Sequence, residues 1–237
     1  MRRLLGLALA ISAVVATPAC AQDVWSWSVL VPSYAQTDIL STMLREDINR
    51  RDTTPAPPRA AAPVRLRYTP SPARRSANLA RFVAKTRKVN PGGADDLERL
   101  FATDLFGQIG GLLRPYGLRT DDVADAYTVW WIAAWDASRG HGGADSDHDR
   151  ATYQAVRAQA ARALARVPSF AGADDAARQE FAELLLVQAV LAEAAVTQAK
   201  GDPQRLRAVA GAVNQGARAM GVDLTAMALT PGGFVAG

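Results

Sequence analysis

Acidic residues beside aromatic ones are the first candidates for chemistry in this sequence of 237 residues. Asp121, Asp122 and Asp125 come just before Tyr127 and three tryptophans, and paired carboxylates near aromatic platforms are what a glycoside hydrolase uses. Acids at the start of a helix also stabilise its dipole, and tryptophans at helical spacing usually belong to a core. The structural interpretation is therefore favoured for this group.

Two further acids, Glu183 and Glu193, interrupt an otherwise apolar run. Acids in such positions often serve chemistry, but they also form ion pairs between helices, here with arginines such as Arg162 or Arg205. The sequence leaves open whether these acids are functional or structural. An envelope-glycan hydrolase with a carboxylate general acid and base, Glu183 or Asp125, is the alternative function.

Both histidines, His141 and His148, lie in the polar loop 139–149 among several aspartates. The spacing does not match a calcium-binding loop, because Arg150 and Val156 occupy the sixth and twelfth positions counted from Asp145. A zinc site of two histidines and an aspartate is geometrically possible, but nothing fixes their separation. The favoured interpretation is an acidic loop whose Asp149 caps the next helix. No metal site and no cofactor are predicted.

The basic segment is the most unusual feature of the composition. Residues 59–88 contain nine basic side chains and no acid, whereas the rest of the chain after residue 21 has a net charge of −7. Four of these side chains, Arg74, Arg81, Lys85 and Lys88, fall on one stripe of a predicted helix and are the predicted binding residues. The stripe is either a solvated face that pairs with the acidic remainder, or a surface for an anionic envelope component. Nucleic acid is the less favoured ligand, because few aromatic residues interleave with the charges.

The first 21 residues read as a signal peptide. Arg2 and Arg3 precede a short apolar run, and Ala19-Cys20-Ala21 fits signal peptidase, which predicts cleavage after Ala21 and a periplasmic or secreted protein. A lipoprotein acylated at Cys20 is disfavoured, because Thr17 stands where such sites usually have leucine. Since Cys20 is the only cysteine, cleavage leaves a chain without thiol chemistry. No transmembrane segment is expected in the mature chain.

The remaining chain divides into two parts. Residues 22–67 form an extended N-terminal arm and a linker rich in proline and alanine, and residues 68–237 form an α-helical domain. Apolar periodicity and capping residues predict six helices in this domain, with Thr120 capping the third and a break in the second near Gly110 and Gly111. Their expected ranges are 72–89, 94–113, 121–138, 150–166, 174–200 and 203–220. Strand signals are almost absent after residue 68.

Two of these helices should be central. The third carries Tyr127, Trp130, Trp131 and Trp135 over a broad arc, and the fifth is apolar on nearly every side. The sequence therefore predicts an all-α fold, a helical bundle of about six helices with two central apolar helices, preceded by the extended arm.

One stretch of the sequence is similar to a known family: Pro115-Tyr-Gly-Leu118, followed by Asp121-Asp-Val-Ala-Asp-Ala-Tyr127 and the tryptophans. It resembles an exported, all-helical bacterial family known only as domain of unknown function 6683, over roughly residues 66–235. The resemblance implies a helical fold and an exported location. It brings no activity, cofactor or catalytic residue.

These observations favour a non-enzymatic binding or interaction module of the cell envelope that uses its basic helix. Its partner is expected to be an anionic envelope component or another protein. No nucleophile motif or phosphate-binding loop is present, so the sequence does not decide whether the protein is an enzyme. It does not decide the oligomeric state either.

Overall fold

The computed structural model describes residues 64–167, 170 and 172–237. The predicted signal peptide, most of the predicted arm and linker, and Arg59 lie outside these residues. Seven α-helices are present in the described part, in place of the six expected. Their bounds are α4 (Pro72–Arg87), α5 (Pro91–Phe101), α6 (Leu105–Leu113), α7 (Val123–Ala137), α8 (Arg150–Ala165), α10 (Asp175–Ala199) and α11 (Pro203–Ala219). The prediction of an all-α bundle is confirmed.

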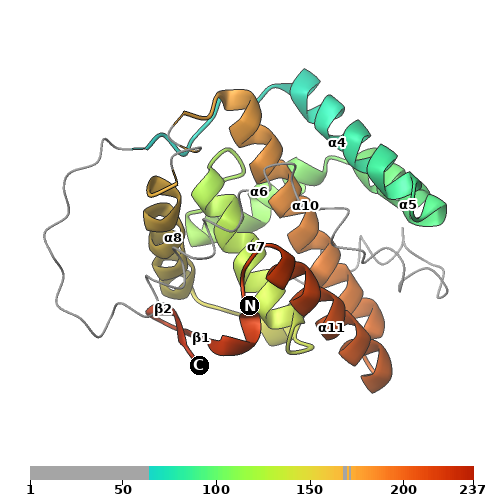
Figure 1. The fold of residues 1–237 in the computed structure, drawn as a ribbon, viewed down its shortest axis with the longest axis vertical. Helices are drawn as coiled ribbons and strands as arrows, with labels where there is room; N and C mark the ends of the chain where they lie inside the picture. The colour runs from blue at the N-terminus through green and yellow to red at the C-terminus, as the bar shows by residue number, and fades with distance from the viewer. Residues whose placement is uncertain (1–63, 168–169, 171) are drawn as a thin grey trace, which may run out of the picture.

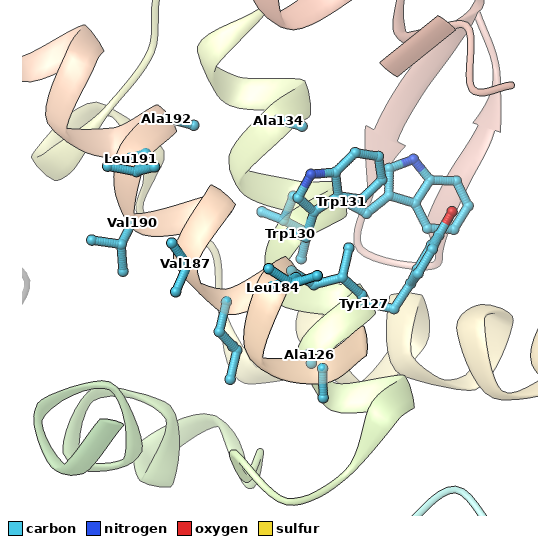
Figure 2. Packing of buried hydrophobic residues seen from close by; sticks show 14 of the residues in the cluster. Ala126, Tyr127, Trp130, Trp131, Ala134, Leu184, Val187, Val190, Leu191 and Ala192 are labelled. Atoms are coloured by element: carbon cyan, nitrogen blue, oxygen red, sulfur yellow. The ribbon is translucent and has the colours of Figure 1, made fainter. Parts of the chain in front are cut away.

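Helices α7 and α10 form the centre of the bundle. They face each other through large apolar side chains of both helices, with Trp130 and Trp131 fully buried (Figure 2). Helix α8 packs against α7, α11 packs against α10, and α4 leads into α5 at one edge of the molecule (Figure 1). The two helices that the sequence marks as most apolar are therefore the two central ones.

The caps of the helices explain most of their starting points. Five helices begin after a residue whose side chain accepts a hydrogen bond from a backbone N–H in the first turn: Ser71, Asn90, Asp149, Asp174 and Asp202. The prediction that Asp149 caps α8 is confirmed. Helix α10 ends before Gly201, whose φ of +91° favours glycine.

The break within 94–113 lies elsewhere than predicted. The chain leaves the helix after Phe101 and restarts at Leu105, because the carboxylate of Asp104 accepts a hydrogen bond from the Gly107 backbone N–H and caps α6. Gly110 and Gly111 lie inside α6. The buried side chains of Ile109 and Leu113 offset the intrinsic cost of helical glycine.

Helix α7 is capped by Asp122 and not by Thr120. Asp122 accepts hydrogen bonds from the backbone N–H groups of Ala124 and Asp125 at 2.9 and 3.2 Å. Asp122 itself is extended, because the chain forms an antiparallel bridge there with Arg67: Tyr68 N–H donates to the Asp121 carbonyl, and Val123 N–H donates to the Leu66 carbonyl. The pairing delays the first helical residue to Val123.

A small β-hairpin at the end of the chain was not predicted. Strands β1 (Met227–Thr230) and β2 (Gly233–Ala236) pair antiparallel and pack on α7 and α8. The Phe234 ring stacks on Trp131 with centroids 4.4 Å apart, and the Gln159 side-chain amide binds both the N–H and the carbonyl of Phe234. The hairpin therefore closes one side of the aromatic core.

No helix in the described residues combines the length and the apolar character that crossing a membrane requires.

Candidate functional site

Most cations of the basic segment pair with acids of the same molecule. Arg65 pairs with Asp175, Arg67 with Asp121, Arg75 with Glu183, Arg81 with Glu180, and Arg87 with both Asp95 and Glu98. The charge segregation seen in the sequence is therefore largely compensated within the fold, as one of the two interpretations expected.

The four predicted binding residues divide into two pairs. Arg74 donates hydrogen bonds to the Gln179 side chain of α10 and to the Thr69 carbonyl just before α4. Arg81 forms an ion pair with Glu180 of α10, so both arginines connect α4 to α10. Lys85 and Lys88 are exposed near the C-terminal end of α4, and no ion pair joins them to an acid in the part of the chain that the structure describes.

Of the two lysines, Lys88 lines an open groove between α4 and α5, whereas Lys85 falls on the opposite side of α4. The groove has a volume of about 660 Å³, apolar side chains such as Leu79, Val83 and Phe101, and Lys88 at its rim. Next to it, Val89 is 52% exposed, which no other large apolar side chain of the described residues approaches. The end of α4 thus combines positive charge with accessible apolar surface.

Glu183, an acid of uncertain role in the sequence, has a structural environment. Its carboxylate accepts hydrogen bonds from Arg75 at 2.8 Å, from Asn78 at 2.8 Å and from Gln179 at 2.9 Å, and the residue is 1% exposed. Its cation comes from α4, whereas Arg205 pairs with Asp202 at the start of its own helix. Glu183 therefore ties α4 to the centre of the bundle.

Asp125 is buried in a similar cluster. It pairs with Arg157 of α8 and accepts a hydrogen bond from the Arg119 backbone N–H at 2.9 Å. Burial first, and then the neighbouring Asp122, raise the pKa of Asp125 to about 6, although Arg157 acts in the opposite direction. Both proposed hydrolase carboxylates are thus surrounded by protein donors.

The two histidines are not brought together. His141 is exposed, whereas the His148 Nε2 lies 2.9 and 3.1 Å from the two carboxylate oxygens of Asp136, a residue that is 1% exposed. The hydrogen bond to Asp136 raises the pKa of His148. Over the described residues, no group of three or more acidic, histidine or cysteine side chains is placed to hold a metal ion.

A second hollow lies inside the bundle. It has a volume of about 120 Å³, is partly open to solvent, and is lined by side chains from α6, the 3₁₀ turn at Arg114–Tyr116, α7, the turn at Gly143–Ser146, α8 and α10. Most of its wall is aliphatic. We refer to it as the interior cavity.

One end of the interior cavity is polar. Asp136, Ser146 and Glu193 line it together with Tyr116 and Tyr153, whose rings lie 4.4 Å apart. Burial raises the pKa of Glu193 to about 7, and the nearby Asp136 adds to the shift, while a hydrogen bond from the Gly143 backbone N–H opposes it. A group with such a pKa changes charge near neutral pH.

The sequence identified some of these residues but not their assembly. Glu193 and His148 are candidates from separate segments of the sequence. Ser146, Tyr116 and Tyr153 carried no signal for the cavity, because serines and tyrosines are common in loops and helix faces. Only the fold brings residue 193 next to the turn at 143–146.

The fold and this cavity define a class of protein: an all-α bundle with a small, largely apolar cavity that has acidic groups at one end. The chain belongs to the family of unknown function DUF6683, whose model matches residues 1–236, a longer stretch than the resemblance in the sequence suggested. No curated protein and no solved structure is detectably similar to the chain.

Proposed function

We propose that the protein is a non-enzymatic binding module of the bacterial cell envelope, which holds an anionic envelope component at the exposed end of α4. One observation carries the proposal: Lys85 and Lys88 have no ion pair in the described residues, although most cations of the same segment do. The charges of both lysines, and the open groove that Lys88 lines, are available to a ligand with negative charge and some apolar surface.

The proposed location rests on the signal peptide predicted at residues 1–21, with cleavage after Ala21. Such a peptide directs a protein to the periplasm or outside the cell, where anionic lipids and polymers are abundant partners for a basic surface.

The hydrolase alternative receives no specific support. A general acid or base must exchange a proton with its substrate, and the carboxylates of Glu183 and Asp125 already bind arginines of the same chain. The binding proposal therefore takes precedence.

The test is the double charge reversal Lys85→Glu/Lys88→Glu in the mature protein. We expect it to abolish cosedimentation with vesicles containing phosphatidylglycerol, or capture on an immobilised acidic polysaccharide, and binding of the unaltered protein should weaken with added salt. Because both side chains are exposed, the melting temperature should change little.

The matched control is Arg114→Glu/Arg207→Glu, which makes the same change in net charge at two exposed positions away from the end of α4. If this control loses as much binding as the lysine variant, the protein responds to net charge alone and the proposed surface is wrong. Equal binding to neutral phosphatidylcholine vesicles would also contradict the proposal.

A further inference from the structure

We propose that the interior cavity is a binding site for a small primary amine with a compact apolar body, whose ammonium group pairs with Glu193. This site is separate from the exposed end of α4, so the inference goes beyond the function proposed above.

The shape of the cavity sets the apolar part of the ligand. Its volume of about 120 Å³ is slightly smaller than that of apolar protein cavities of about 150 Å³ that accept benzene. Ile109, Leu113 and Ile132 form part of its aliphatic wall. A single ring or a short branched alkyl chain is close to this size, and because the cavity is partly open to solvent, the polar end of the ligand does not have to be enclosed with it.

The charge of the ligand follows from a comparison of the partly buried Glu193 with the fully buried acids of the bundle. Asp122 and Asp125 share Arg157, Glu183 has Arg75, and Asp136 has His148. Within the described residues no arginine or lysine contacts Glu193, and its only hydrogen bond there comes from the Gly143 backbone N–H. A carboxylate removed from water is costly without a cation, and here a ligand can supply the missing charge.

A second observation points to the same end of the cavity. Ser146 is 6% exposed and lines the cavity, and its hydroxyl has no hydrogen-bond partner among the residues that the structure describes. Buried hydroxyls in folded proteins nearly always have a partner. An ammonium group carries three N–H donors, so it can serve the Ser146 hydroxyl as well as a carboxylate.

The charged and titratable groups that face Glu193 favour a cation over an anion. They are Asp136 from α7, Asp147 and His148 from the loop, and Tyr153 from α8, with Tyr116 beside Tyr153. The charge of His148 is matched by Asp136, which it contacts. Once Glu193 is ionised, this end of the cavity therefore has net negative charge.

The experiment is calorimetric titration of the whole mature protein with benzylamine at about pH 8, where Glu193 is ionised. We expect benzylamine to bind and the matched neutral and anionic probes, benzyl alcohol and benzoate, to bind at least about tenfold more weakly. At about pH 5.5, where Glu193 is protonated and His148 is charged, the affinity for benzylamine should fall by a similar factor.

The decisive variant is Glu193→Gln, which keeps the volume and an acceptor for the Gly143 N–H but removes the charge. It should weaken benzylamine at least about tenfold and reduce the pH dependence of binding. Glu180→Gln is the control, since it alters the same residue type on the same helix outside the cavity, and it should leave the affinity unchanged. Ser146→Ala, a second variant that leaves every ion pair intact, should weaken binding severalfold.

Several results would overturn the proposal. They are an absence of benzylamine binding, equal affinity for benzyl alcohol, and unchanged affinity in Glu193→Gln. Lys85→Glu/Lys88→Glu should bind benzylamine normally, so failure of the envelope-binding proposal and failure of this one can be told apart.

Discussion

At the scale of single residues, the charges of the fully buried acids and of the partly buried Glu193 are compensated differently. Asp125 and Glu183 have arginine partners that come from helices distant in the sequence, and their burial is compensated. Glu193 has only a backbone N–H donor among the described residues. The sequence marks all three acids as unusual, but it cannot distinguish them, because the distinction depends on which side chain the fold brings to each one.

Glu193 should lower the stability of the protein as pH rises. Its folded pKa of about 7 lies above the usual glutamate value, so ionisation between about pH 4.5 and pH 7 favours the unfolded state. Glu193→Gln should therefore unfold at a higher denaturant concentration than the unaltered protein at about pH 8, with little difference at about pH 4.5. Denaturant titrations of both proteins at the two pH values measure this.

The titration of His148 also lowers the stability of the protein as pH rises, so its contribution must be distinguished from that of Glu193. Its pKa is raised by Asp136, so its contribution to stability is present at low pH and is lost as pH rises through the folded pKa. Because His148 is intact in both proteins, its effect enters the difference between them only through its electrostatic interaction with Glu193. A difference that stays constant across the pH range would contradict the assignment to Glu193.

Replacing Arg75 should lower the free energy of unfolding far more than replacing Arg87 of the same helix. Arg75→Met leaves the carboxylate of Glu183, which is 1% exposed, without its cation, and such a loss typically costs about 3–5 kcal/mol. Arg87→Met disrupts only exposed ion pairs and should cost less than about 1 kcal/mol. Urea titrations give the free energy of unfolding of each variant. Similar losses of stability in the two variants would contradict the conclusion that the Arg75–Glu183 ion pair holds α4 against α10.

At the scale of elements, the helices were predicted within a few residues, because apolar periodicity and capping side chains are local signals. The errors have local causes as well. The helix boundary lies at Asp104 and not at Gly110 and Gly111, because the Asp104 carboxylate caps α6. Asp122 is extended because it pairs with Arg67, a contact that no local signal in the sequence reports. The hairpin was missed although Pro231-Gly232 between two short apolar runs is a turn signal, because each strand has only four residues.

Two glycines provide a matched test of the hairpin. Gly233 has a φ of +97°, and a Cβ added there would lie 2.5 Å from the Gln159 side-chain oxygen, which is held by Phe234. Gly233→Ala should therefore cost at least about 1–2 kcal/mol. Gly211 is exposed inside α11 with nothing near its added Cβ, so Gly211→Ala should stabilise by up to about 1 kcal/mol. Thermal unfolding of both variants checks the two signs, and a harmless Gly233→Ala would show that the hairpin adds little to the fold.

At the scale of the whole molecule, the fold class and the identity of the central helices were readable from the sequence, but the cavity was not. Its wall consists of ordinary apolar residues such as Ile109, Val129 and Leu186, which in the sequence look the same as residues that pack without a gap. The basic stripe on α4 was readable too. Its division into paired arginines and exposed lysines required the positions of Glu180 and Gln179 on α10.

The helices should differ in the free energy of their local unfolding. Helices α7 and α10 are buried on nearly every side, whereas α5 packs mainly on α4 at the edge of the bundle. Native-state hydrogen exchange should therefore find the slowest amides in α7 and α10, and α5 should exchange at a markedly lower opening free energy. Equal protection in α5 and α10 would mean that the edge and the centre unfold as one cooperative unit.

The contact between Trp135 and His148 gives the protein an optical reporter of its own. Their ring centroids lie 6.4 Å apart, and the same imidazole contacts Asp136 at the polar end of the cavity. A protonated imidazole quenches the emission of a nearby indole, whereas a neutral one quenches it much less. The brightness of Trp135 therefore registers the charge of His148, and any ligand that changes this charge becomes visible in a fluorimeter without a label.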